Sequence, residues 1–239
     1  MSQELYLLAS SIAKKKYWIR QNLKPKKAPW IVKVTYFRII RPVLRAYYKL
    51  FKMRHPGSPW TSPASIIFFE RALTKDMTGF EYGSGGSTKF FASKLKQLTS
   101  LEHDQAWFKG VKHDLALSKL SNVDYHLIEK IESSEEIKET IKLGSTSITH
   151  NFLKSFYSYS GFIGRFPDGH FDFILVDGRA RVDCIVRSIP KLKPGGILVL
   201  DNSERERYGK AYDLLKGWPK IFTTTGFTDT TLWFKPGNE

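Results

Sequence analysis

From residue 64 onward, short apolar segments alternate with segments of helical periodicity, and this alternation restricts the fold more than any other feature of the chain. We expect strands ending at Tyr82 and Glu102 and over 123–128, 171–176, 197–200, 220–224 and 230–235, helices over 64–74, 87–97, 105–119, 133–142, 180–191 and 205–216, and an irregular stretch over 144–170. Strands separated by helices pair in parallel, because each helix carries the chain back to the same end of the sheet. The sequence therefore predicts a doubly wound α/β sheet with helices on both faces.

The first 55 residues differ from the rest of the chain in charge. They hold 14 Lys and Arg residues and one acid, Glu4, whereas the other 184 residues hold 24 basic and 22 acidic residues. Basic residues recur there every three or four positions, which places them on one helical face: Arg38, Arg41, Arg45, Lys49 and Lys52. Pro42 is expected to kink or split this helix. We predict a basic amphipathic helical extension over 1–55, a Pro-rich linker over 56–63 and the main domain over 64–239.

Two uses of this extension fit the sequence. Its apolar side can pack on the main domain while its basic side stays in water, or both sides together can bind an anionic membrane surface. The apolar run over 5–13 does not have the order of a secretion signal, because its lysines follow it and Glu4 precedes it. A single cysteine, Cys184, suits a reducing compartment. We expect a cytoplasmic protein, with membrane-peripheral attachment as the alternative.

The segment from Glu81 to Thr88 reads Glu-Tyr-Gly-Ser-Gly-Gly-Ser-Thr and follows a predicted strand. Glycines here let the main chain approach a cofactor and leave amide groups of the next helix free to bind it. A phosphate loop is excluded because no Gly-Lys-Ser/Thr follows, and a dinucleotide loop fits poorly because Thr88 stands where a small residue is required. The carboxylate of Glu81 suits a cofactor that carries positive charge.

Two further acids follow predicted strands, at the edge where sheets of this kind bind ligands. Glu102 lies about twenty residues after the glycine loop, where a carboxylate can accept hydrogen bonds from both hydroxyl groups of a ribose. Asp104 suits the N-cap of the next helix. Asp177 ends the apolar strand over 171–176 and places a carboxylate at its tip.

Four motifs now stand in order: Glu81 to Thr88, Glu102-His-Asp104, Val176-Asp-Gly-Arg179 and Lys193-Pro-Gly-Gly-Ile-Leu-Val-Leu-Asp201. This series resembles that of the class I S-adenosylmethionine-dependent methyltransferases over residues 60–235. The resemblance implies a Rossmann-like sheet of seven strands, the last antiparallel, with S-adenosylmethionine as cofactor. The cofactor-binding residues that it implies are Glu81, Tyr82, Gly83, Ser84, Gly85, Gly86, Ser87 and Thr88 near the methionine part, Glu102 and His103 at the ribose, Ile128 and Glu129 at the adenine, and Asp177 at the reaction site.

Asp177, Asp201 and Asn202 match, residue by residue, the cation ligands of the metal-dependent O-methyltransferases that these positions resemble. The resemblance implies Mg²⁺, which prefers oxygen ligands and keeps water in its shell. The alternative is that Asp201 and Asn202 only form a turn or cap the next helix.

The reaction that these residues favour is methylation of an oxygen atom on a small molecule, a sugar or a glycan precursor. Asp177 would take the proton of the acceptor, either as a base or through a metal. Two alternatives remain: an RNA methyltransferase that uses the basic extension, and a non-catalytic nucleotide-binding protein of the same fold. Nucleic acid is the less favoured partner, because the Asn/Asp-Pro-Pro-Tyr/Phe motif is missing. The sequence predicts no oligomeric state.

Overall fold

A computed structural model describes residues 2–15, 19 and 21–237 of the chain, and its centre is a seven-stranded sheet. The strands lie in the order β3-β2-β1-β6-β7-β9-β8. They are β1 (Thr78–Tyr82), β2 (Gln97–Glu102), β3 (Val123–Leu127), β6 (Phe171–Val176), β7 (Leu192–Asp201), β8 (Lys220–Thr224) and β9 (Asp229–Phe234). The last strand, β9, runs antiparallel to both its neighbours, whereas β3, β2, β1, β6 and β7 are parallel. The predicted doubly wound α/β sheet is confirmed.

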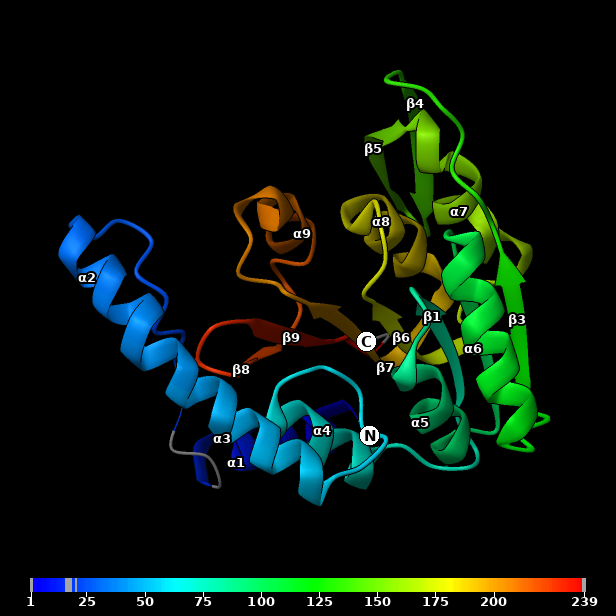
Figure 1. Cartoon of the computed structure of the whole chain (residues 1–239). Helices are drawn as coiled ribbons and strands as arrows, with labels where there is room; N and C mark the ends of the chain where they lie inside the picture. The colour runs from blue at the N-terminus through cyan, green and yellow to red at the C-terminus, as the bar shows by residue number, and fades with distance from the viewer. Residues whose placement is uncertain (1, 16–18, 20, 238–239) are drawn as a thin grey trace.

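Helices cover both faces of this sheet (Figure 1). They are α4 (Pro63–Ala72), α5 (Gly86–Lys94), α6 (Gln105–Leu117), α8 (Arg181–Lys191) and α9 (Gly209–Leu214). Successive side chains of a strand point to opposite faces. In β6, Phe173 and Leu175 pack with α4 and α5, while Ile174 and Val176 pack with α8 and α9. The apolar run of β6 is therefore explained by burial on both faces.

The N-terminal helix α1 (Ser2–Lys15) belongs to the core of the main domain. Its Ala9 and Ile12 are each 3% exposed and pack against α4 and the sheet. The prediction of one helical extension over 1–55 is wrong in this respect, because the basic charge of the segment hid the apolar face of α1. Residues 16–18 and 20 of the predicted extension lie outside the described residues.

A long helix follows, formed by α2 (Trp30–Thr35), a π-helical turn η1 (Tyr36–Ile40) and α3 (Arg41–Arg54), and Figure 1 shows it running unbroken past the edge of the sheet. The wider π-helical turn directly precedes Pro42, which lacks an N–H group and would crowd a normal turn. Pro42 therefore neither splits the helix nor ends it. Among the described residues, no helix combines the length and the apolar character needed to cross a bilayer.

The segment over 133–153 is a β-hairpin, not the predicted helix and irregular stretch. Its strands are β4 (Glu136–Leu143) and β5 (Thr146–Leu153), joined at Gly144, whose φ is +59°. The spacing of Ile137 and Ile141 fits a helix, but exposed and half-buried side chains alternate along β4 with the period of a strand. The short helices η2 (Lys154–Phe156), α7 (Tyr157–Gly161) and η3 (Phe162–Arg165) follow the hairpin.

Candidate functional site

A cavity of about 810 Å³ opens at the carboxyl ends of β1, β2 and β6. Of the predicted site residues it is lined by Gly83, Ser84, Gly85, Gly86, Glu102, His103 and Asp177. In doubly wound sheets this edge is where ligands bind. The structure therefore brings the glycine loop, the acid after β2 and the acid after β6 together around one space.

Glu81 lies beneath the glycine loop and not on the cavity, which corrects its predicted contact with the cofactor. Its side chain is 0% exposed and accepts hydrogen bonds from the hydroxyl groups of Ser87 (2.5 Å), Thr88 (2.6 Å) and Ser100 (2.6 Å). Thr88 Oγ1 also accepts a hydrogen bond from the Gly85 amide at 3.0 Å. Glu81, Ser87 and Thr88 therefore hold the loop in shape from below. Burial raises the pKa of Glu81 to about 7, although the three hydroxyl groups act against this rise.

Of two glycines in the loop after β1, one allows close packing and the other faces open space. A Cβ atom at Gly83, whose φ is +92°, would lie 2.6 Å from the Gly178 amide nitrogen, so the loops after β1 and β6 touch here. A Cβ atom at Gly86 would meet no other atom within 4 Å. Gly86 thus gives its bare main chain to the cavity, as a loop that approaches a ligand does.

Glu102 lies at the bottom of the cavity and is 4% exposed. Its Oε1 accepts hydrogen bonds from the amides of His103 (2.7 Å) and Asp104 (2.9 Å). Its Oε2 accepts longer bonds from Ser84, at 3.3 Å from the amide and 3.1 Å from the hydroxyl group. The oxygen with the longer bonds is the one that the hydroxyl groups of a ligand could engage most readily.

Trp107 is part of the site although no sequence motif pointed to it. Trp107 is the third residue of α6. Asp104 caps this helix, because its side chain accepts a hydrogen bond from the Trp107 amide at 2.8 Å. The Trp107 indole donates to the Ser84 carbonyl at 2.8 Å and lines the cavity, while its ring is 56% exposed. The sequence carries no signal for this contact, because it depends on the position of α6 beside the glycine loop.

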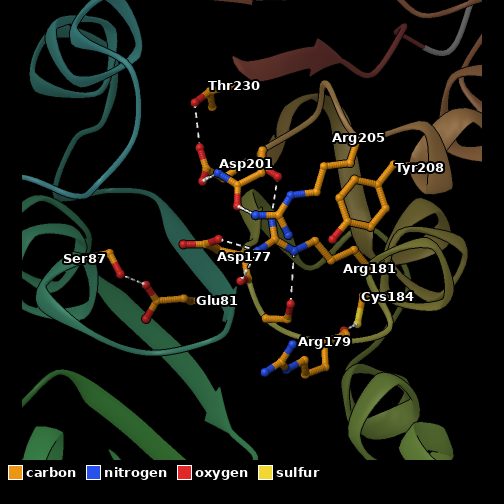
Figure 2. A network of polar contacts seen from close by, with 12 residues as sticks. Glu81, Ser87, Asp177, Arg179, Arg181, Cys184, Asp201, Arg205, Tyr208 and Thr230 are labelled. Carbon is orange, nitrogen blue, oxygen red and sulfur yellow. Dashed lines mark hydrogen bonds and ion pairs between the residues drawn. The ribbon is translucent and has the colours of Figure 1, made fainter. Parts of the chain in front are cut away.

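Asp177 is held by Arg181, a residue that the sequence reasoning missed. Arg181 Nη2 donates to Asp177 Oδ1 at 2.8 Å, and the same guanidinium group donates to the main-chain carbonyls of Gly178 and Asp201 (Figure 2). Among the described residues, the other oxygen of Asp177 has no hydrogen bond and the carboxylate lines the cavity. Burial raises the pKa of Asp177, although Arg181 opposes this rise. Asp177 is therefore a carboxylate with one oxygen free to accept a proton.

The structure gives no support to the predicted Mg²⁺ site of Asp177, Asp201 and Asn202. Asp201 is 4% exposed, and its carboxyl group accepts hydrogen bonds from Thr230 (2.7 Å) and Asn202 (2.8 Å). Burial and the nearby Asp177 raise the pKa of Asp201 to about 8 when no cation is present. The described residues include no group of three His, Cys, Asp or Glu side chains placed to hold a metal ion. The guanidinium group of Arg181 supplies positive charge here instead.

Three other predicted cofactor residues lie outside the cavity lining. Tyr82 is buried in the core and donates to the Ser160 carbonyl at 2.8 Å. Ile128 packs against the core, and Glu129 is exposed. The Ile128 amide donates to the Glu102 carbonyl at 2.7 Å, so the main chain after β3 lies beside the end of β2 although the Ile128 side chain packs in the core.

The comparisons with known proteins show similarity of structure only. No family model matches the chain, and no curated protein matches it. An rRNA-methylase candidate from Clostridium thermocellum is similar at 10% identity with a TM-score of 0.51, covering 76% of this chain and 99% of that one. An rRNA methylase from Streptococcus thermophilus is similar at 10% identity with a TM-score of 0.50, covering 72% of this chain and 93% of that one.

A third similar structure is precorrin 8W decarboxylase from Methanobacterium thermoautotrophicum, at 15% identity with a TM-score of 0.50 and coverage of 75% of this chain and 94% of that one. At these identities the likeness is one of fold, and one fold supports several reactions. The chain has the seven-stranded Rossmann-like fold of the class I methyltransferases.

Proposed function

We propose that this chain is an S-adenosylmethionine-dependent methyltransferase. The observation that carries the proposal is the single cavity that joins the glycine loop, Glu102 and Asp177 at the carboxyl ends of β1, β2 and β6 in a fold of this class. The cavity volume of about 810 Å³ is in the range that takes a cofactor and part of an acceptor.

The residues around the cavity fit such a cofactor. Gly86 leaves open space where a side chain would otherwise stand, and Glu102 offers a carboxylate oxygen to hydroxyl groups. Trp107 has its indole ring tied over the loop by the 2.8 Å bond to the Ser84 carbonyl. These groups would hold the nucleoside part, and a cation at the reactive end would be favoured by the carboxylate of Asp177.

The acceptor atom that we propose is an oxygen of a small molecule, and Asp177 is the group that takes its proton. When bound, S-adenosylmethionine supplies an electrophilic methyl group. Asp177 has one oxygen free, while Arg181 fixes the other at 2.8 Å. Positioning of this kind contributes much of the acceleration in a displacement, so few reactive side chains are needed. A route through Mg²⁺ is not proposed, because Arg181 binds one oxygen of Asp177, and Thr230 and Asn202 bind the two oxygens of Asp201.

A transfer assay tests this function. The full chain is incubated with S-adenosylmethionine labelled in its methyl group and with a small-molecule extract, and the products are separated by mass. We expect label in a product of low mass. Label that appears in added RNA would support the RNA alternative, and no transfer together with binding of NAD would contradict the proposal.

We also propose that the long helix α2–α3 attaches the protein to an anionic membrane surface. Residues 30–54 include seven Lys and Arg residues and no acid. The apolar side chains of Ile39, Val43 and Leu50 are 61%, 58% and 59% exposed, so nothing among the described residues covers them. Basic residues beside exposed apolar ones suit anionic lipid. Lys52 does not contribute to this basic surface, because its ammonium group donates hydrogen bonds to the Ser58 and Pro59 carbonyls.

Vesicle sedimentation of the full chain tests this attachment. Because α1 packs in the core, we substitute exposed side chains and do not delete the extension. Full-length protein is expected to sediment with vesicles that contain phosphatidylserine and much less with phosphatidylcholine alone, and Ile39→Ser with Val43→Ser should abolish most of this. The control is Leu117→Ser, which removes a 70% exposed apolar side chain on α6. Equal sedimentation of all three proteins would contradict the attachment.

A further inference from the structure

A second cavity, of about 290 Å³, lies beside the cofactor cavity. The two share Gly178, Arg179 and Arg181, which belong to the turn between β6 and α8. The other wall comes from Arg205, Arg207 and Tyr208, in the turn after β7. A group bound in this second cavity would therefore lie next to Asp177, on the side away from the glycine loop.

Four arginines line this small cavity, and only one has an acidic partner. Arg181 binds Asp177, as described above. Arg205 donates to the Asn202 side-chain carbonyl at 2.7 Å, Arg207 donates to the Tyr208 hydroxyl at 3.0 Å, and Arg179 lies 3.5 Å from the His103 imidazole. In the part of the chain that the structure describes, none of these three makes an ion pair. Figure 2 shows Arg205 and Tyr208 beside Arg181.

The one acid in the cavity wall does not neutralise these arginines. Asp183 accepts hydrogen bonds from His150 at 2.7 Å and from the Leu153 amide at 2.9 Å, so its two oxygens are engaged by the hairpin. Glu204 and Glu206 line two neighbouring cavities with Lys24 and Lys26; Arg205 also lines these cavities but makes no ion pair with either acid. Three guanidinium groups that make no ion pair among the described residues therefore line one small cavity, whereas residues 56–239 as a whole hold 24 basic and 22 acidic residues.

The main chain between two of these arginines is strained. Ala180 has a φ of +45°, in the left-handed region that disfavours a residue with a Cβ atom. Such a conformation costs about 1–2 kcal/mol and persists where the surroundings require it. Here it turns the chain sharply between Arg179 and Arg181, so that both side chains reach the space shared by the two cavities.

We propose that this arginine cavity binds a phosphate group of the methyl acceptor, so that the substrate is a phosphorylated small molecule. The proposal rests on the methyltransferase function above. Guanidinium groups bind phosphate through paired N–H donors, and a phosphate dianion can accept from several of them at once. A ligand with a single carboxylate group would leave most of the positive charge of these arginines uncompensated. The volume suits one or two phosphoryl groups better than a polynucleotide.

Calorimetry on the full chain tests this site with pyrophosphate as the probe, in the presence of saturating S-adenosylhomocysteine and at low salt. We expect pyrophosphate to bind the unchanged protein, and the double variant Arg205→Gln with Arg207→Gln to bind it at least about tenfold more weakly. A matched control with the same loss of charge is Arg71→Gln with Arg165→Gln, two exposed arginines on α4 and η3. The control variant should bind pyrophosphate like the unchanged protein.

Three results would overturn the inference: no binding of pyrophosphate, equal binding by all three proteins, or tighter binding of malonate than of pyrophosphate. If an RNA oligonucleotide binds more tightly than pyrophosphate, and this binding is lost in the variant that lacks Arg207, then the proposed acceptor is nucleic acid and not a small molecule. The same samples report on S-adenosylhomocysteine. If it fails to bind the unchanged protein while pyrophosphate binds, the methyltransferase proposal fails and the anion site stands. If it binds all three proteins and pyrophosphate binds none, only the anion site fails.

Discussion

The two sides of the cleft hold their carboxylates in different ways. On the β1–β2 side, hydroxyl groups bind Glu81, amide and hydroxyl groups bind Glu102, and His103 Nδ1 lies 2.7 Å from Glu102 Oε1. Among the described residues, neither acid pairs with a Lys or Arg. On the β6–β7 side, Asp177 is engaged by the guanidinium group of Arg181, with Arg205 close by. The first side leaves bare glycine main chain for a ligand, and the second leaves positive charge. The difference indicates that the β1–β2 side binds the cofactor and the β6–β7 side binds the acceptor.

The largest effect is expected from Asp177→Asn, which removes the proton acceptor on the β6 side but keeps a carbonyl oxygen for Arg181. Turnover should fall by about 10²- to 10⁴-fold, as is usual for the loss of a general base, while affinity for S-adenosylhomocysteine stays nearly unchanged. Initial rates of labelled methyl transfer and calorimetry measure the two quantities.

The control for this prediction is Asp168→Asn, because Asp168 is an exposed acid that pairs with Lys191 at 2.7 Å. Its rate should equal that of the unchanged protein. A loss below about tenfold in Asp177→Asn would contradict the role of this carboxylate as the base.

The glycines of the β1 side allow a matched pair of substitutions. Gly83→Ala should lower the free energy of unfolding by about 4 kcal/mol, because its φ of +92° is strained for alanine and the new methyl group would strike the Gly178 main chain. Gly86→Ala should leave stability unchanged and weaken S-adenosylhomocysteine binding, since its methyl group enters the cavity. Chemical denaturation and calorimetry check both. Equal destabilisation by the two variants would show that Gly86 does not face the ligand.

The next effect concerns Glu81 and pH. Burial raises the pKa of Glu81 from an ordinary 4.5 to about 7. Below pH 4.5 both states hold the proton. As pH rises, the unfolded chain loses its proton first, so the contribution of this group to stability declines between pH 4.5 and 7, by about 3 kcal/mol in total.

Glu81→Gln does not titrate, so the difference in unfolding free energy between Glu81→Gln and the unchanged protein should move in favour of the variant as pH rises through this window. Urea denaturation from pH 4 to 8 measures it, with Glu129→Gln, an exposed glutamate, as the control. A difference that does not vary with pH would show that Glu81 is ionised throughout and not buried as described.

The smallest effect is expected at the strained turn on the β6 side. Ala180→Gly should raise the free energy of unfolding by about 1 kcal/mol, because glycine accepts the φ of +45° without a Cβ clash. Ala46→Gly, at an exposed position in the interior of α3, should have the opposite sign and a similar size, because it only adds freedom to the unfolded chain. Destabilisation by both would mean that Ala180 is not strained.

The fold could be predicted largely from the sequence, because its signals are local. The strand over 171–176 was predicted with the bounds that β6 has, and the glycine loop followed β1 as expected. The hairpin could not be told from a helix, since Ile137 and Ile141 fit both periods over so short a segment. Helix α1 was misjudged because charge, and not the apolar positions of Ala9 and Ile12, guided the reasoning.

The residues of the candidate site that directly follow predicted strands, including Asp177, could be predicted from the sequence. Gly83 to Gly86 and Glu102 could be named because the loop and the strand after it are close in sequence. Arg181 escaped notice because an arginine four residues after an acid is common on exposed helices, and the Asp201 carbonyl that it also binds is distant in the chain. The predicted Mg²⁺ site finds no support, and the identities of Asp201 and Asn202 do not reveal that a guanidinium group lies beside Asp177.

The most direct measurement is a calorimetric titration of S-adenosylhomocysteine into the unchanged protein, Glu102→Ala and Glu129→Ala. Glu102 lines the cavity, whereas Glu129 is exposed and lies outside it. The structure predicts binding by the unchanged protein and by Glu129→Ala alike, and binding about 10- to 100-fold weaker by Glu102→Ala, as for the loss of charge-assisted hydrogen bonds. No binding by the unchanged protein, or equal affinities of Glu102→Ala and the unchanged protein, would contradict the assignment of this cavity to S-adenosylmethionine.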